Sequence, residues 1–331
     1  MTANKVYLLK TEPNVVIWVS NTMVATILIT GATGLIGRHL TETLLEHGYL
    51  VNQLSRREIT PKHPGIKVFK WDVYKGKIDT ACIDGADAVI HLAGENLGAK
   101  PWTNQRKKAI IESRTRSIGL IYDLLRKNSN HQVKTVISAS AVGFYGDHGN
   151  DMLTESSKPG GDFLAETCMA WETAVDKGKK LGLRVVKFRN GIVLARDGGA
   201  LPTLAKPIRA GFGAPLGSGN QWVPWIHVRD LVKMFMFALE HRNLEGPYNA
   251  ASPNPVTNKF LTEALAQRTN SKVWLPKVPA FLLRAILGRM SEMVLVSAKT
   301  SADKILMEGF TFTFPTLDKA LDDLYSDRYG F

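Results

Sequence analysis

Three glycines stand three residues apart in the segment TGATGLIG, at Gly31, Gly34 and Gly37. They follow an apolar run at Thr26–Thr30 and open a segment with helical periodicity. Gly31 permits a tight turn, Gly34 lets a phosphate approach the backbone, and Gly37 lets a helix pack closely on a sheet. Free N–H groups at the start of such a helix face a pyrophosphate. This order of strand, loop and helix predicts a dinucleotide-binding loop.

The end of the next apolar run, Leu50–Ser55, indicates which dinucleotide is bound. A site for NAD usually has Asp or Glu here, where the carboxylate accepts hydrogen bonds from ribose hydroxyls. This chain has Arg56 and Arg57 instead, and a guanidinium matches the geometry of a phosphate. Glu58 follows the arginines and is poorly placed to accept from the ribose. The sequence therefore favours NADP(H) over NAD(H), and a solvated basic turn is the alternative.

These motifs lie in a first half in which strand-like and helical segments alternate. Strands are expected at Thr26–Thr30, Leu50–Ser55, Lys67–Trp71, Ala88–Leu92, Thr135–Ser140 and Arg184–Phe188. Helices are expected at Gly37–His47, in the stretch that ends at Arg126, and at about Phe163–Leu181. Such alternation predicts an α/β fold, a Rossmann-type doubly wound parallel sheet with helices on both faces.

The second half of the chain has a different pattern. Glycine and proline are frequent between Gly198 and Pro224, which indicates long loops of the kind that form substrate pockets. The end of the chain is mainly helical. We expect an N-terminal extension at 1–22, a Rossmann NADP-binding domain at 23–190 with a returning segment near 222–250, and a smaller C-terminal substrate-binding domain at 191–331.

Composition narrows the class of protein. The 331 residues carry a net charge of +12, but the Lys and Arg residues are scattered, which favours a solvated surface over a nucleic-acid site. No apolar run reaches the roughly 18 residues of a membrane span. The two cysteines, Cys82 and Cys168, are too few for a disulfide framework. We therefore expect a cytoplasmic protein with a small-molecule substrate, no nucleic-acid or membrane partner and no metal.

Several further stretches resemble the extended short-chain dehydrogenase/reductases. They are HLAGENL at His91–Leu97, SASAVGFYGD at Ser138–Asp147 and PWIHVRDLV at Pro224–Val232. With KPGGDFLAETCMAWE and the ending GFTFTFPTLDKALDDL, they resemble the atypical group usually labelled epimerase family protein, or sugar-nucleotide epimerase-like. The resemblance covers about Met23 to Leu324. It implies an NADP-type Rossmann domain with a small C-terminal substrate domain, and it implies no particular substrate.

The resemblance also implies cofactor-binding roles for individual positions. The residues that match are Gly31, Thr33, Gly34, Leu35, Ile36 and Gly37 in the pyrophosphate loop, Arg56 beside Arg57 at the 2′-phosphate, Asp72 and Val73 at the adenine, Ala93 and Gly94 on the ribose side, Ser138 to Ser140 beneath the nicotinamide, and Arg189, Asn190 and Ile192 at its carboxamide.

The usual proton donor of that superfamily is missing. Its members usually have Tyr and Lys four residues apart on the helix after the fifth strand, where the Lys lowers the pKa of the Tyr. Here Leu164 and Cys168 stand at those positions, and neither can do this work. Ser140 matches the usual catalytic Ser, and Tyr145 is the best remaining donor, with an expected pKa near 10. The other groups that could reach the site are Glu95, Asp162 and His227.

Two functions remain open. The first is an NADP(H)-binding oxidoreductase or epimerase-like enzyme with an altered acid/base. The second is a non-catalytic NADP(H)-binding protein with a regulatory or redox-sensing role. The missing Tyr–Lys pair favours the second function, whereas the long loops and the substrate domain favour the first.

Cys168 shares one helical stripe with Leu164, Trp171 and Val175, which predicts a buried core thiol rather than a nucleophile.

Overall fold

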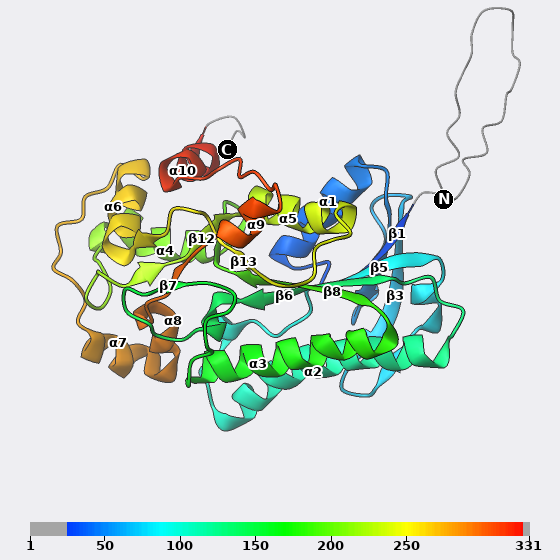
Figure 1. The fold of residues 1–331 in the computed structure, drawn as a ribbon. Coiled ribbons are helices and arrows are strands. Elements are labelled where there is room, and N and C mark those ends of the chain that lie inside the picture. The colour runs from blue at the N-terminus through cyan, green and yellow to red at the C-terminus, as the bar shows by residue number, and fades with distance from the viewer. Residues whose placement is uncertain (1–24, 327–331) are drawn as a thin grey trace, which may run out of the picture.

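A large sheet runs through the centre of the molecule (Figure 1). The computed structural model describes residues 25–326, so the predicted extension at 1–22 lies outside the described residues. The sheet has eight strands, all parallel except β4, which is antiparallel to β3. In spatial order the strands are β13 (Gly246–Ala250), β8 (Arg184–Asn190), β6 (Thr135–Ala141), β5 (Ala86–His91), β1 (Thr26–Thr30), β2 (Leu50–Ser55), β3 (Ile66–Asp72) and β4 (Lys77–Ile78).

Helices cover both faces of this sheet. On one face α2 (Asn104–Lys127) packs beside α3 (Phe163–Asp176), and on the other α1 (Leu35–Glu46) packs beside α5 (Val228–Glu240) (Figure 1). The strand order reverses between β1 and β5, since β2 lies on one side of β1 and β5 on the other. The arrangement confirms the predicted Rossmann-type doubly wound fold, whose ligand crevice opens at this reversal, beyond the carboxyl ends of the strands.

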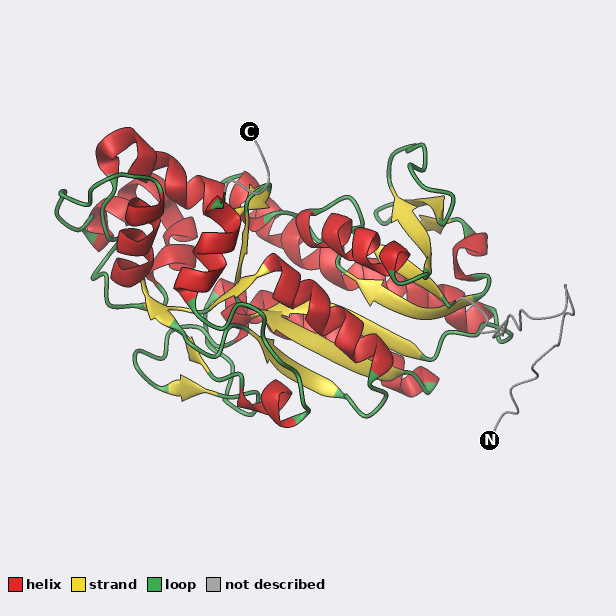
Figure 2. Ribbon diagram, turned by 90° about the horizontal axis from the view of Figure 1, so that it is seen from above, coloured by secondary structure: helices red, strands yellow, loops and turns green. Residues whose placement is uncertain are grey.

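Most of the remaining elements gather beyond one end of the sheet (Figure 2), whereas α9 packs on β13. The helices are α4 (Ala200–Pro207), α6 (Asn258–Arg268), α7 (Ala280–Leu287), α8 (Glu292–Leu295), α9 (Asp303–Met307) and α10 (Leu317–Tyr325). The short strands are β7 (Met152–Leu153), β9 (Ile192–Ala195), β10 (Gly198–Gly199), β11 (Trp222–Val223), β12 (Trp225–His227), β14 (Val256–Thr257) and β15 (Lys299–Thr300). The segment 222–250 also supplies β13 to the large sheet and α5 to one of its faces. The predicted domain boundary between residues 190 and 191 stays a prediction.

Most predicted elements lie where the sequence pattern places them. The strands Thr26–Thr30 and Leu50–Ser55 have the predicted bounds, and the other predicted strands differ by one or two residues at an end. The helix predicted at Phe163–Leu181 is shorter than expected. It ends at Asp176, and a 3-10 turn at Lys177–Leu181 completes the segment.

A buried carboxylate joins the sheet to the C-terminal part of the chain. Asp230 on α5 is fully buried, and its two oxygens accept hydrogen bonds from the backbone N–H groups of Thr313 and Phe314, each at 2.8 Å. Phe314 belongs to a second apolar cluster, which lies under α4, α6 and α10 and is separate from the main core of the sheet. Asp230 therefore fixes the path of the chain between the two cores.

Replacement of Asp230 tests this junction. In Asp230→Ala the two N–H groups lose their acceptors inside the protein, so we expect the free energy of unfolding to fall by about 2–5 kcal/mol. Asp318→Ala is the control, because Asp318 is exposed and pairs with Arg268 at 3.4 Å. Such surface pairs contribute up to about 1 kcal/mol. Denaturant unfolding measures both variants, and equal losses would contradict this role for Asp230.

Candidate functional site

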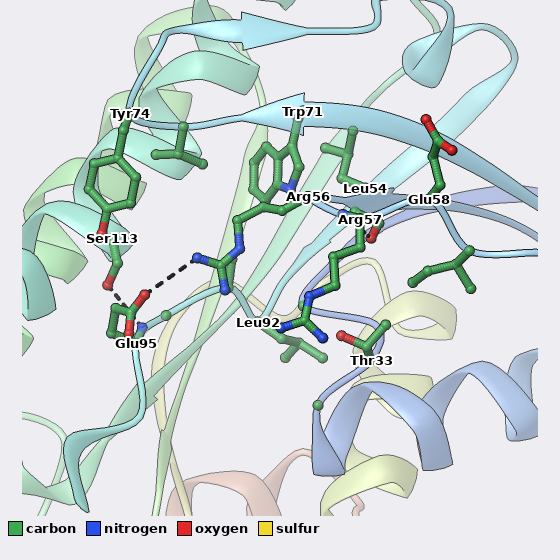
Figure 3. Close-up of a pocket in the computed structure, with 17 residues that line it drawn as sticks. Thr33, Leu54, Arg56, Arg57, Glu58, Trp71, Tyr74, Leu92, Glu95 and Ser113 are labelled. Carbon is green, nitrogen blue, oxygen red and sulfur yellow. Dashed lines mark hydrogen bonds and ion pairs between the residues drawn. The ribbon is translucent and has the colours of Figure 1, made fainter. Parts of the chain in front are cut away.

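A cavity of about 510 Å³ opens at the reversal of strand order. Its walls are the glycine loop after β1 and the segments that follow β2, β3 and β5, with Ser113 from α2 (Figure 3). Eight of the residues predicted to bind the cofactor line it: Gly31, Thr33, Gly34, Arg56, Arg57, Val73, Ala93 and Gly94. The sheet thus brings together at one edge residues from four separate loops.

The glycine loop has the geometry that a close phosphate contact requires. Gly31 has a φ of +71°, and a Cβ added to it would lie 2.8 Å from the backbone of Leu92. A Cβ on Gly37 would lie 2.4 Å from the carbonyl oxygen of Gly31. Helix α1 begins with no side-chain cap and no acidic residue in its first turn, so its N-terminal N–H groups face the crevice without a competing anion. This end of the cavity fits a pyrophosphate.

The two arginines after β2 differ in their contacts. Arg56 pairs with Glu95 at 3.4 Å, and Arg106 pairs with the other oxygen of Glu95 at 2.9 Å. Hydrogen bonding from Arg106 is the main reason why the pKa of Glu95 lies below its usual value. Among the described residues, the Arg57 guanidinium has no hydrogen bond or ion pair with another side chain, and it points toward Thr33 (Figure 3). Arg57 is therefore the cation that remains open to a phosphate.

The other residues assigned to the cofactor lie around this cavity or behind it. Asp72 caps the turn after β3, where its carboxylate accepts from the N–H groups of Tyr74 and Lys75 at 3.0 Å. Leu35 and Ile36 form the first turn of α1. Ser138 is fully buried, and its hydroxyl donates to the carbonyl of Ala139 at 2.8 Å. These positions shape the crevice through the backbone, and their predicted contacts with a cofactor stay predictions.

A second cavity of about 220 Å³ lies where β6 and β8 end. Ala141 and Asn190 pair at these ends, and the segments that follow them line the cavity. The other walls come from Leu97, Leu164, 222–224, α6 and 292–298, and they are largely apolar. Leu164, at the usual position of the catalytic Tyr, faces this space. Asn190, with Ile192 beside it, has a buried Oδ1 without a hydrogen-bond partner.

Behind this cavity lies a buried cluster of charged residues. Arg189 donates from Nε to one oxygen of Glu172 at 2.8 Å and from Nη2 to the other at 3.1 Å. Ser140 donates to Glu172 at 2.8 Å, and Lys187 lies 3.3 Å from it. Burial raises the pKa of Glu172, but Arg189, Lys187 and the Ser140 hydrogen bond outweigh it, so the pKa lies below its usual value. Glu172 is therefore a carboxylate held by its neighbours.

Tyr145 belongs to the same cluster. Its hydroxyl donates to Oδ1 of Asn249 at 2.6 Å and accepts from Nη1 of Arg189 at 3.0 Å. Burial outweighs the nearby guanidinium and raises the pKa of Tyr145 to about 12, so the expected value near 10 is wrong. Tyr145 is fully buried and lines neither cavity. Its role as proton donor stays a prediction, and this geometry does not favour it.

Ser140 and Arg189 lie in a similar situation. Both are buried, and the hydrogen bonds to Glu172 occupy the Ser140 hydroxyl and two nitrogens of Arg189. Neither lines either cavity. The predicted contacts of Ser140 with a substrate oxygen and of Arg189 with the carboxamide stay predictions. Cys168 is buried, and burial raises its pKa to about 12, which confirms the prediction of a core thiol.

The three alternative proton donors lie elsewhere. Glu95 is paired in the first cavity, and Asp162 caps α3 by accepting from the N–H of Ala165 at 2.8 Å. His227 is buried 3.3 Å from Asp323, and burial lowers its pKa to about 4. The second cavity has an acidic residue that sequence reasoning missed, Glu292 on α8. No motif marks it, since it lies in a helical segment without a recognisable pattern.

Comparison with known proteins assigns the class. The crevice and fold are those of an NAD(P)-binding Rossmann protein, and residues 27–251 match the "NAD dependent epimerase/dehydratase family". Residues 278–324 match a "Domain of unknown function (DUF1731)". The chain belongs to the NAD dependent epimerase/dehydratase family, which confirms the resemblance read from its motifs.

Individual relatives cover nearly the whole chain. "Epimerase family protein SERP0438" of Staphylococcus epidermidis is 36% identical over 300 residues, which are 90% of this chain and 98% of that protein. "Epimerase family protein YfhF" of Bacillus subtilis is 34% identical over 303 residues, 91% and 98% of the two chains. The crystal structure of human epimerase family protein SDR39U1 (isoform 2) with NADPH has a TM-score of 0.79 and 28% identity, and the match covers 91% and 99% of the two chains.

Residues 25–326 lack two features, a membrane-spanning helix and a cluster of metal ligands. Within that range no helix has the length and apolar character that a membrane crossing requires. In the same range no group of three or more His, Cys, Asp or Glu residues is arranged to hold a metal ion.

Removal of the Tyr145 hydroxyl tests whether it is structural. Tyr145→Phe leaves the buried Asn249 and Arg189 each without one partner, so we expect a loss of about 1–3 kcal/mol in the free energy of unfolding. Affinity for the dinucleotide, measured by calorimetric titration, should not change, since the side chain lines neither cavity. A variant that loses affinity but keeps its stability would contradict this interpretation.

The Glu172 carboxylate predicts a dependence of stability on pH. Its pKa is lower in the folded protein than the reference value of 4.5, so its stabilisation is present above about pH 4.5 and is lost as the pH falls through the folded value. Glu172→Gln should be less stable at pH 7 by roughly 3 kcal/mol or more, and should lose less stability on acidification. Unfolding curves from pH 7 to pH 3 measure this. The control is Glu263→Gln, which removes a surface ion pair with Lys259 and should cost at most about 1 kcal/mol.

Proposed function

We propose that this chain is an NADP(H)-dependent oxidoreductase that acts on a small molecule in the second cavity. The observation that carries the proposal is the pair of cavities along one edge of the sheet. The first cavity has the N-terminus of α1, which lacks a side-chain cap, and the guanidinium of Arg57. The second cavity is largely apolar and lies at the ends of β6 and β8. A dinucleotide that crosses the strand reversal extends from the first toward the second. When bound, the cofactor supplies a hydride.

The chain's own residues fit the parts of this cofactor. The N–H groups after Gly34 are placed for the pyrophosphate, and Arg57 for the 2′-phosphate. At the other end, Asn190 has a buried amide oxygen without a partner, which suits the carboxamide N–H₂ group. Glu58 lies after the arginines and pairs with Lys70 at 3.5 Å. These contacts support NADP(H) over NAD(H).

A non-catalytic NADP(H)-binding protein is the second candidate. The observation that favours it is the position of Leu164, which fills the place of the usual Tyr, while Ser140 is bound to Glu172. The two candidates differ in one measurement. An enzyme oxidises NADPH when a carbonyl compound is added, whereas a binding protein leaves NADPH reduced.

For both candidates we propose a location in the cytoplasm, where two buried free thiols are stable. Neither candidate requires a nucleic-acid or membrane partner.

The NADP(H) assignment is tested at Arg57. Arg57→Ala removes a charged hydrogen bond of about 1.5–3 kcal/mol to the 2′-phosphate, so NADPH should bind roughly 10- to 100-fold more weakly. NADH lacks this phosphate, and its affinity should not change. Calorimetric titration of both cofactors gives the two ratios.

Two controls accompany this measurement. Arg116→Ala removes an exposed guanidinium on α2 that pairs with Glu112, and should leave both affinities unchanged. Arg56→Ala should have a smaller effect than Arg57→Ala, because Arg56 is already paired with Glu95. Equal affinity of the parent protein for NADPH and NADH would overturn the assignment.

A further inference from the structure

The second cavity has one ionisable side chain, Glu292. Twenty described residues line the cavity, and the other side chains with polar atoms are Asn190, Trp222 and Asn258. Trp222 donates to Asn150 at 2.9 Å, and Asn258 accepts from the N–H of Leu216 at 2.7 Å. Glu292 has a buried Oε2 without any hydrogen-bond partner. An ionised carboxylate oxygen in this state costs more free energy than a protonated one.

The charges around Glu292 come from three other elements. Asp162, the N-cap of α3, raises the pKa of Glu292, while Lys107 on α2 and Arg289 in the turn before α8 lower it. None of them forms an ion pair or hydrogen bond with Glu292 among the contacts of residues 25–326. Burial is the largest influence, and the net effect is a raised pKa. The surroundings therefore favour protonation of Glu292 more than those of an ordinary glutamate do.

The position of Glu292 is fixed by contacts with the Rossmann part of the chain. Ser297 donates to the carbonyl of Gly149 at 2.6 Å, and β15 pairs with β7 in the loop after β6. Gln221 donates to the carbonyl of Val294 at 3.0 Å. These bonds hold the segment 292–300 against the loop that follows β6. The acid therefore faces the same space as Leu164 and the ends of β6 and β8.

We propose that Glu292 donates the proton in this enzyme, and that its substrate is a small uncharged carbonyl compound with an apolar body. The proposal rests on the proposed function, since it assumes that NADPH binds in the crevice. The carbonyl carbon receives the hydride that NADPH supplies, and the C=O π bond breaks. The oxygen takes the proton from Glu292, which leaves an alcohol, NADP⁺ and a Glu292 carboxylate. That carboxylate regains its proton from water.

The lining of the cavity also excludes a class of substrate. A nucleotide sugar carries a diphosphate, and proteins hold diphosphates with Arg, Lys or helix N-termini. None of the twenty described residues that line the second cavity is Arg or Lys. Its volume of about 220 Å³ suits a small molecule rather than a nucleotide. Its apolar walls stabilise a hydrocarbon body instead.

The protonation state of Glu292 can be tested without turnover. Infrared difference spectra between the parent and Glu292→Gln, each with NADPH, should contain the C=O band of one protonated carboxyl group at pH values above about 4.3, the unperturbed pKa of a glutamate. That band should disappear as the pH rises through the raised pKa of the group. Glu263→Gln, which removes a carboxylate on α6 that pairs with Lys259, is the control. Carboxylate bands alone for Glu292 would overturn the proposal.

Turnover tests the catalytic role and the substrate class. Hexanal, cyclohexanone and UDP-4-keto-6-deoxyglucose, a nucleotide sugar that carries a ketone, are each added to the parent and to Glu292→Gln, and NADPH oxidation is followed. We expect one of the two apolar carbonyl compounds to be reduced and the keto nucleotide sugar to be inert. The variant should lose at least about 100-fold in kcat, the usual contribution of a general acid, and bind NADPH as the parent does. Glu263→Gln should keep the parental rate.

The failures of this test differ from one another. If Glu292→Gln reduces the carbonyl compound at the parental rate, Glu292 is not the donor and the oxidoreductase function stands. If the keto nucleotide sugar is reduced and the apolar compounds are not, the substrate class is wrong. If NADPH binds and none of the three compounds is turned over, the result overturns the enzyme assignment and this proposal with it.

Discussion

A carboxylate buried on α3 organises the carboxyl edge of the sheet. Glu172 is 5% exposed, and a charge in that position is tolerated only when donors surround it. Arg189 and Lys187 from β8 and Ser140 from β6 supply those donors, and Arg189 in turn binds Tyr145. Removal of one partner would leave an uncompensated charge, so the cluster binds the two strands and the helix together as one unit.

This cluster has a consequence for the chemistry of the site. The polar groups that the fifth and sixth parallel strands, β6 and β8, usually direct toward a nicotinamide are here directed at Glu172. What remains at the surface of the second cavity is largely apolar, with an unpaired amide on Asn190 and an unpaired acid on Glu292. The crevice is thus divided by charge: the end near β2 has the arginines, and the end near β6 and β8 has none among its lining residues.

The parts that the sequence predicts correctly are local. The strand, the glycine loop and the helix from Thr26 to Glu46 follow from turn chemistry and periodicity within a few residues. The pairing of Arg56 with Glu95 joins residues 39 positions apart, and that of Tyr145 with Asn249 joins residues 104 apart. Such partners depend on the register and packing of the whole sheet. The pKa of Tyr145 could not be predicted for the same reason, because it is set by burial.

Glu292 could not be identified from the sequence either, because its surroundings depend on the packing of distant segments. Its sequence neighbourhood, GRMSEMVLV, contains nothing that distinguishes it from a solvated helix residue. It acquires its character because the segment 297–300 is bonded to the loop after β6, which places α8 beside Leu164. The residues matched to a domain of unknown function, 278–324, therefore form one wall of the second cavity. A cavity assembled from two parts of the chain brings a carboxyl group and an apolar surface to the end of the crevice where α3 has neither Tyr nor Lys.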